Sequence, residues 1–274
     1  MILPAVLIRR GKYSVADPLF VEERRPVLVA RKLRRGADAG DIVLVRTREK
    51  ERSLRGEVVK VIGPSTDPRN VYDALFASIE TRRGFSNKVE AEADAAADKE
   101  PGERADLRHL PTVTIDGEDA KDFDDAISIE ITENGYRLWV HIADVTHYVE
   151  PGSALDREAA RRANSVYLPG TVAPMLPARL SNKVCSLKPN VERATVTVEM
   201  RVDSSGEVKS SKAYRSTIVS GARLTYEGVD AFLRGGAEIE QPELLQAAYA
   251  LSRRLKTRAA LRGKLELGGR EPEY

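Results

Sequence analysis

The chain has 274 residues, of which 42% are hydrophobic and 31% charged, and its formal net charge at pH 7 is +2. This composition suits about two soluble domains, and the bulk charge does not indicate nucleic-acid binding. The single cysteine, Cys185, excludes an intrachain disulfide and a cysteine-rich metal site. No apolar run approaches the length of a membrane span, and no secretory signal is readable, so we expect a cytoplasmic protein.

The first 64 residues are basic, with 15 Lys and Arg against 8 Asp and Glu. Short apolar runs separated by glycines predict four strands and a small OB-like barrel. Such barrels bind single-stranded nucleic acids through basic grooves and stacking aromatic rings. Tyr13 and Phe20 are the aromatic residues available here, and core packing is at least as good an explanation for Phe20. The strands are expected at residues 3–8, 26–31, 41–47 and 56–62.

Residues 65–106 predict a connecting region. Asp67 followed by Pro68 is typical of a helix start, helical spacing continues to Ile79, and Gly84 is a candidate stop. An alanine-rich and acidic stretch then predicts a second helix and a linker around Pro101.

Residues 114–126, with the sequence TIDGEDAKDFDDA, contain five aspartates and one glutamate. Like charges at this density repel one another unless something compensates them. A loop could turn Asp116, Asp122 and Asp125 toward one point, where clustered carboxylates bind a hard divalent cation such as Mg²⁺. The alternative is a solvated acidic loop, which is the more common role of a charge run. Strand-like segments at 112–115 and 126–132 flank the loop closely, which favours a metal site.

Apolar alternation predicts a hairpin of residues 126–132 and 136–143, with a type I′ turn at Asn134-Gly135. Trp139 lies on the face opposite to the isoleucines, where core packing is expected. His141 and His147 do not have a zinc-site spacing, and we interpret them as structural.

Beyond this hairpin, Ser153 is expected to cap a helix that runs to about residue 163. Residues 164–177 predict an irregular loop, and a second hairpin is expected at 195–202 and 207–216. Two helices complete the expected fold, at 226–233 and 243–261.

Several of these segments resemble one known family. The stretch TIDGEDAKDFDDA resembles the active-site signature of the ribonuclease II / ribonuclease R family of 3′→5′ exoribonucleases. The segments HIADVTHYV at 141–149, SVYLPG at 165–170, PMLP at 174–177 and LSNKVCSL at 180–187 resemble later blocks of that family, in the same order. A single motif would be weak support, but an ordered set over most of the chain is specific.

The resemblance implies an enzyme that uses Mg²⁺ to remove nucleotides from the 3′ end of single-stranded RNA as nucleoside 5′-monophosphates. The family pattern implies that Asp116, Asp122 and Asp125 hold the metal and that Asp124 is the catalytic residue. It also implies that Tyr167 stacks on the terminal base and that Tyr226 contacts RNA.

The fold class implied is α+β. A cold-shock-type OB-like barrel is expected at 1–64, a docking helix and linker at 65–106, and the N-terminal half of an RNB catalytic domain at 107–274. Because the resemblance stops at Tyr274, partway through that domain, we expect a fragment with weak activity on its own. The alternative is a non-catalytic RNA-binding module with a relic active site.

Overall fold

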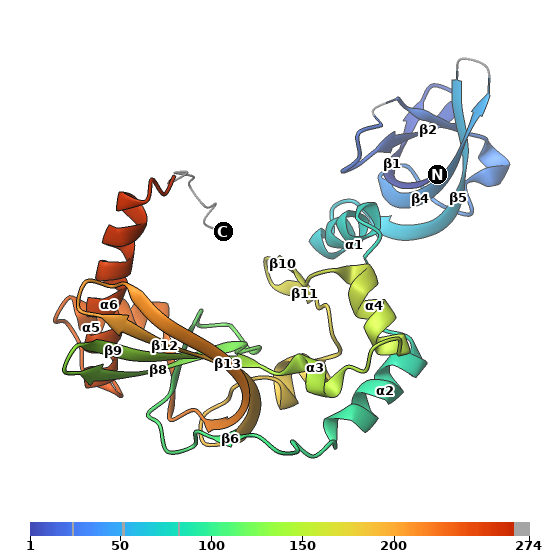
Figure 1. The fold of residues 1–274 in the computed structure, drawn as a ribbon. Coiled ribbons are helices and arrows are strands. Elements are labelled where there is room, and N and C mark those ends of the chain that lie inside the picture. Colours follow the sequence, from blue (N-terminus) through green and yellow to red (C-terminus); the bar gives the residue numbers. More distant parts are fainter. Residues whose placement is uncertain (24, 51–52, 82, 266–274) are drawn as a thin grey trace. The chain divides into compact units, whose positions relative to one another are not determined.

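The computed structural model describes residues 1–265 except 24, 51–52 and 82. The chain forms two compact units (Figure 1). One comprises Met1–Phe85 and Arg162–Met175, and the other comprises Ser86–Arg161 and Leu176–Tyr274. The boundaries expected near residues 64 and 106 stay predictions, and the end of the chain at Tyr274 lies outside the described residues.

The first unit contains a closed β-barrel, which confirms the OB-like prediction. Its strands follow the order β1-β2-β3-β5-β4 around the barrel. Alternate side chains such as Leu3, Leu7, Val43 and Val45 fill the interior. Phe20 is exposed, so of its two explanations core packing is wrong, and stacking on a base stays a prediction. The strands are β1 (Ile2–Arg10), β2 (Tyr13–Pro18), β3 (Val27–Val29), β4 (Asp41–Lys50) and β5 (Ser53–Pro64).

Three further parts of the chain belong to this unit: a 3₁₀-helix, an α-helix and a short hairpin. A short 3₁₀-helix (Arg31–Leu33) follows β3, and α1 (Pro68–Ser78) follows the barrel. The Asp67 side chain accepts a hydrogen bond from the backbone N–H of Arg69, which confirms the predicted helix cap. Residues 164–177 are not wholly irregular as expected, because β10 (Val166–Leu168) and β11 (Thr171–Ala173) form a short hairpin.

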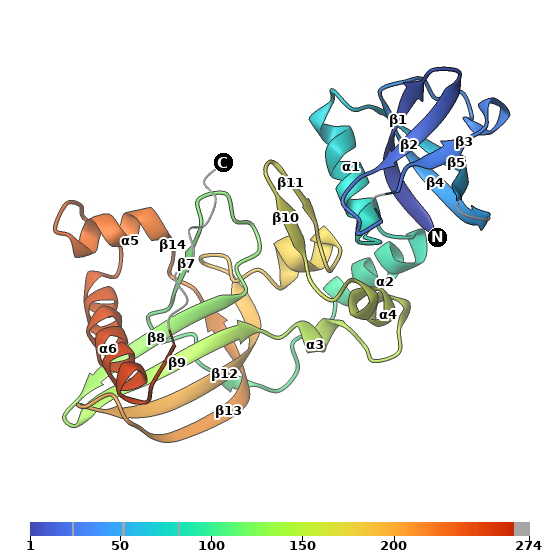
Figure 2. The same ribbon diagram turned by 90° about the horizontal axis from the view of Figure 1, so that it is seen from above.

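The second unit is organised around a seven-stranded sheet with the order β14-β7-β8-β9-β12-β13-β6. Figure 2 shows β8, β9, β12 and β13 side by side in this sheet. Most neighbours are antiparallel, whereas β14 pairs with β7, and β6 with β13, in parallel. The strands are β6 (Ala105–Asp106), β7 (Val113–Asp116), β8 (Asp125–Thr132), β9 (Gly135–Ala143), β12 (Glu192–Asp203), β13 (Val208–Val219) and β14 (Ala222–Thr225).

The hairpin of β8 and β9 has the predicted strands but not the predicted turn. Thr132 pairs with Gly135, so Glu133 and Asn134 are the turn residues. A type I′ turn needs positive φ at both turn residues, and neither has it. Gly135 has a different role, because a Cβ built there would lie 2.1 Å from the carbonyl oxygen of Val202 on β12.

Helices cover the sheet and connect its strands. The apolar core joins Ile129, Tyr136 and Val202 of the sheet to Leu245 and Leu251 of α6. Ser153 caps α4 as predicted, since its hydroxyl accepts the backbone N–H of Asp156. Among the described residues, no helix is both long and apolar enough to cross a membrane. The helices are α2 (Asn87–Ala97), α3 (Val145–Tyr148), α4 (Ala154–Arg162), α5 (Tyr226–Leu233), α6 (Pro242–Leu261) and a π-helical turn (Leu180–Val184).

Candidate active site

The acidic loop connects two neighbouring strands of the sheet. Asp116 is the last residue of β7 and Asp125 is the first residue of β8, and these strands pair through Val113 and Ile127. Asp122 and Asp124 lie in the loop between them. The sheet therefore fixes both ends of the loop, as expected for a site presented by a rigid scaffold.

Backbone hydrogen bonds hold the second half of the loop. The backbone N–H of Phe123 donates to the hydroxyl of Ser186, which itself donates to the carbonyl of Lys121. Leu187 donates its N–H to the Phe123 carbonyl, and Ala143 donates to the Asp124 carbonyl. Asp124 is thus placed by its own backbone rather than by side-chain contacts.

Arg223 holds the first half of the loop, a contact that the sequence analysis did not predict. Its Nη2 donates to the carbonyls of Gly117 and Glu118, and its guanidinium lies 5.4 Å from the ring centroid of Phe123. Arg223 is on β14, whose parallel pairing with β7 brings it to the loop. No local pattern announces a contact between residues so far apart in the chain.

The carboxylates of the loop act on one another. Burial raises the pKa of Asp116, and the charges of Asp125 and Asp122 raise it further, while Thr114 and Arg223 lower it. The pKa of Asp124 is also raised, first by loss of hydration and then by the charges of Asp122, Asp125 and Asp116. Asp124 still contacts solvent, so protons can reach it. The ionised forms of Asp116 and Asp124 are therefore disfavoured when no cation is near.

The donor set fits a hard cation in its chemistry. The Oδ2 atom of Asp116 is buried and has no hydrogen-bond partner among the described residues. Carboxylate oxygens are the ligands that Mg²⁺ takes in proteins, and a cation would offset the repulsion. The described residues, however, contain no group of three or more His, Cys, Asp or Glu side chains arranged to hold a metal ion. The metal ligands Asp116, Asp122 and Asp125 therefore stay a prediction.

The two predicted RNA-binding tyrosines lie in different units. Tyr226 follows Thr225, which is the register partner of Asp116, so the aspartates and Tyr226 share one edge of the sheet. Its side chain is 61% exposed, which leaves its ring accessible. Tyr167 lies on β10 of the first unit and is 64% exposed.

His141 and Asp144 are both held by buried contacts within the protein. His141 is fully buried and hydrogen-bonds with Ser128 and Thr197. Asp144 forms a buried ion pair with Arg104, with 2.7 Å between Oδ2 and Nη2. The structural interpretation of His141 is therefore correct.

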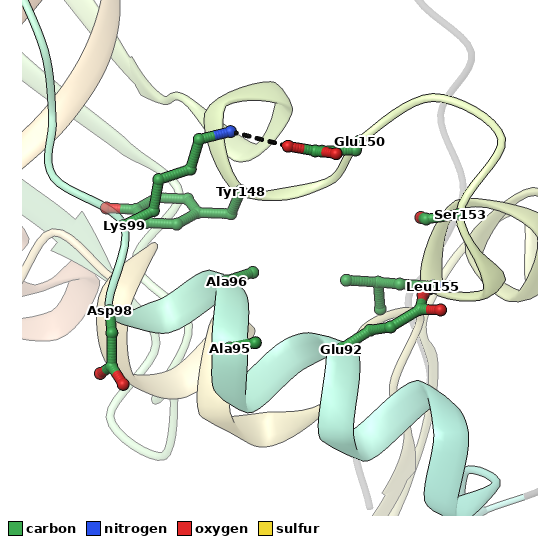
Figure 3. Close-up of a pocket in the computed structure, with 9 residues that line it drawn as sticks. All are labelled: Glu92, Ala95, Ala96, Asp98, Lys99, Tyr148, Glu150, Ser153 and Leu155. Atoms are coloured by element: carbon green, nitrogen blue, oxygen red, sulfur yellow. Dashed lines mark hydrogen bonds and ion pairs between the residues drawn. The ribbon is translucent and has the colours of Figure 1, made fainter.

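A separate pocket of about 540 Å³ lies between α2 and the start of α4 (Figure 3). Lys99 and Glu150 form an ion pair of 3.3 Å across it, and the Glu92 carboxylate accepts the backbone N–H of Leu155. None of the predicted site residues lines this pocket.

Comparison with known proteins places these features in one family. A model of the RNB domain matches residues 104–274. Ribonuclease R of Vibrio parahaemolyticus is 38% identical over 275 residues, covering 96% of this chain and 33% of that protein. Ribonuclease R of Escherichia coli is 42% identical over 214 residues, covering 75% and 26%. The chain therefore spans about a third or less of the length of these relatives.

Solved structures agree. The structure of Mycoplasma genitalium RNase R in complex with double-stranded RNA superposes with a TM-score of 0.85 at 28% identity, covering 96% of this chain and 48% of that one. The yeast pseudonuclease Ssd1 matches at a TM-score of 0.72 and 18% identity over 94% of this chain and 34% of its own, which shows the fold alone. On the family model and the relatives together, the chain belongs to the RNB-domain family, with ribonuclease R among its relatives.

Proposed function

We propose that this chain provides the metal-binding part of a Mg²⁺-dependent 3′→5′ exoribonuclease of the ribonuclease II / ribonuclease R type. The substrate is single-stranded RNA, the products are nucleoside 5′-monophosphates, and the location is the cytoplasm. The observation that carries the proposal is the mutual repulsion of the aspartates on a loop fixed at both ends, where Asp116 and Asp124 have raised pKa values. A cluster of like charges destabilises a folded protein, so its presence indicates that the charge has a function.

In this proposal Asp116, Asp122 and Asp125 hold Mg²⁺, which when bound polarises the phosphoryl oxygens and lowers the pKa of water. Asp124 is the catalytic residue. Its raised pKa suits a carboxylate that takes a proton from the attacking water, because a base works best when its pKa approaches the operating pH.

In this proposal the roles of the two tyrosines do not depend on the sequence of the RNA. Tyr167 stacks on the terminal base of the RNA, and Tyr226, which follows the register partner of Asp116, contacts the RNA. Stacking on an aromatic ring is worth about 1–3 kcal/mol per base and tolerates every base, as a general RNA-degrading enzyme requires.

We expect only weak hydrolysis from the 274-residue chain by itself, because it spans about a third of its ribonuclease R relatives. Groups that stabilise the transferring phosphoryl group are typically worth about 10³-fold or more in rate. The matched part covers 33% of the Vibrio parahaemolyticus relative.

The alternative, a non-catalytic RNA-binding module, has one observation in its favour. On the barrel, Arg48 of β4 lies directly opposite Arg55 of β5, and neither has an ion-pair partner among the described residues. Like charges opposite each other on neighbouring strands destabilise a sheet, so a bound polyanion would stabilise this surface.

One gel experiment tests both functions. The protein is incubated with 5′-labelled single-stranded RNA and Mg²⁺, and shortening is followed beside a binding assay without Mg²⁺. Asp124→Asn is the test variant, and Asp119→Asn is the matched control, because Asp119 lies in the same loop but outside the predicted set. We expect stepwise 3′ shortening that Asp124→Asn abolishes and Asp119→Asn retains. Binding without any shortening, even at high enzyme concentration, would favour the binding module.

A further inference from the structure

A hollow lined by charged and hydroxyl side chains lies on the sheet of the second unit, away from the acidic loop. It has a volume of about 370 Å³ and is formed by three adjacent strands, β9, β12 and β13. Every side chain that lines it is charged or carries a hydroxyl: Arg137, Glu199, Arg201, Ser210, Ser211 and Lys212.

Glu199 fixes the geometry of this hollow from below. It is buried, and its Oε1 accepts hydrogen bonds from Nε and Nη2 of Arg137 at 2.8 and 2.7 Å. Its Oε2 accepts from the Tyr214 hydroxyl at 2.7 Å and from Lys212 Nζ at 3.1 Å. Burial alone would raise the pKa of Glu199, but these donors lower it to about 2, so the carboxylate is ionised. Two of the three cations are therefore held in place before any ligand arrives.

The positively charged side chains of the hollow outnumber the carboxylate that pairs with them. Arg201 lies directly opposite Arg137 on the neighbouring strand, and it has no hydrogen-bond or ion-pair partner among the described residues. Directly opposed like charges destabilise a β-sheet. With three cations and one carboxylate, the lining carries a net charge of +2. Arg137 and Arg201 also line a neighbouring hollow, together with three acidic residues, Glu130, Glu133 and Asp203. None of these three acids lines the hollow of β9, β12 and β13.

We propose that this hollow is a binding site for a phosphate monoester or free phosphate dianion. A terminal phosphate carries about −1.5 to −2 charges near neutral pH and three strong acceptor oxygens, which matches the net charge and the donors. Arginine guanidinium groups are well suited to phosphate oxygens, and Ser210, across from Arg201, adds a hydroxyl donor. A backbone phosphodiester carries a single charge and would leave half of the excess uncompensated.

This site is separate from the candidate active site. Asp125 begins β8, whereas Arg137 pairs with Glu130 five residues further along that strand. At about 3.3 Å per residue the two sites lie roughly 17 Å apart along the strand. The proposal therefore does not depend on catalysis at the acidic loop, and its test uses no Mg²⁺.

The chain contains its own reporter for this site. Trp139 is the only tryptophan, and the guanidinium of Arg137 lies 4.6 Å from its ring centroid. Occupation of the hollow should change the environment of Arg137 and hence the fluorescence of Trp139. The experiment is a titration of the 274-residue protein with inorganic phosphate, with adenosine 5′-monophosphate and with a dinucleoside phosphodiester at constant ionic strength, using chloride as the control anion.

We expect saturable fluorescence changes with the two dianions, and at least tenfold weaker binding in Arg201→Ala. Partial recovery in Arg201→Lys would confirm the need for a cation. Arg234→Ala removes an exposed arginine that directly follows α5 and is paired with Asp230, and this variant should bind like the unmodified protein.

Tighter binding of the nucleotide than of phosphate would identify a nucleotide as the ligand of the hollow, and equal binding would identify free phosphate as that ligand. The proposal is overturned if no dianion gives a saturable change, if Arg201→Ala binds as well as Arg234→Ala, or if the diester binds as tightly as the monoester. Because Arg201 is exposed, its replacement should not prevent folding, and far-UV circular dichroism of each variant verifies this.

Discussion

His141 gives the second unit a pH-dependent stability that can be measured directly. It lies within a line of buried hydrogen bonds across the sheet, from Thr112 through Ser128 and His141 to Thr197 and Ser216. Burial lowers the pKa of His141 from its ordinary 6.5 to about 4, so the folded protein keeps the imidazole neutral at every pH above that value.

The sign of the effect follows from proton uptake by the unfolded chain. Below pH 6.5 the unfolded chain binds a proton at this histidine, whereas the folded chain does not until about pH 4. Within this range, each unit by which the pH falls lowers the unfolding free energy by about 1.4 kcal/mol. Between pH 7.5 and pH 5 the loss from His141 is therefore about 2 kcal/mol. The aspartates with raised pKa values act in the opposite direction.

The assay is urea unfolding followed by the fluorescence of Trp139, which lies in the second unit and reports on it. The comparison variant is His141→Gln, whose amide can hydrogen-bond on both sides but does not titrate. The aspartates are common to both proteins, so they cancel in the difference. We expect the advantage of the unmodified protein over His141→Gln to shrink by about 2 kcal/mol from pH 7.5 to pH 5. Equal pH dependence in both proteins would refute the argument.

Three further predictions concern particular contacts. Arg223→Ala should speed hydrogen exchange of the backbone amides in 117–123 by removing the donors to two loop carbonyls, as measured by exchange mass spectrometry. Gly135→Ala should lower the unfolding free energy by more than about 1 kcal/mol, because the new Cβ meets a strand carbonyl, whereas Gly117→Ala, also in the second unit, meets open space and should change little in the same urea titration. Asp67→Ala should cost about 1 kcal/mol through loss of the α1 cap, read as a lower helix melting temperature by circular dichroism.

Local patterns explain which elements were predictable. Asp67 and Ser153 are side-chain caps, whose chemistry acts within three residues of the helix start. In the hairpin of β8 and β9, the register pairs Ile127 with Val140 and Ile129 with Leu138, as the alternation of apolar residues requires. The spacing of apolar residues and the capping of helices are properties of short segments, so the sequence specifies them without tertiary information.

Features that depend on distant segments were missed. Nothing in the sequence near Arg223 indicates that its strand pairs in parallel with β7 and that its guanidinium therefore reaches the acidic loop. The prediction of a type I′ turn was wrong for the same reason. Asn134-Gly135 favours that turn locally, but Gly135 is required by the close approach of Val202 on another strand. Phe20 likewise has an apolar side chain that the barrel does not bury.

The second unit places like charges at two ends of the pair β8 and β9. At one end the charges of neighbouring aspartates raise the pKa values of Asp116 and Asp124, and at the other end Arg137 faces Arg201 across neighbouring strands. Between them the strands are joined by buried hydrogen bonds through His141. Repulsion at either end opposes folding, and a rigid centre keeps the charged groups from moving apart. A bound cation at one end and a bound anion at the other would each relieve this repulsion, so ligand binding at both sites should raise the unfolding free energy of the same sheet.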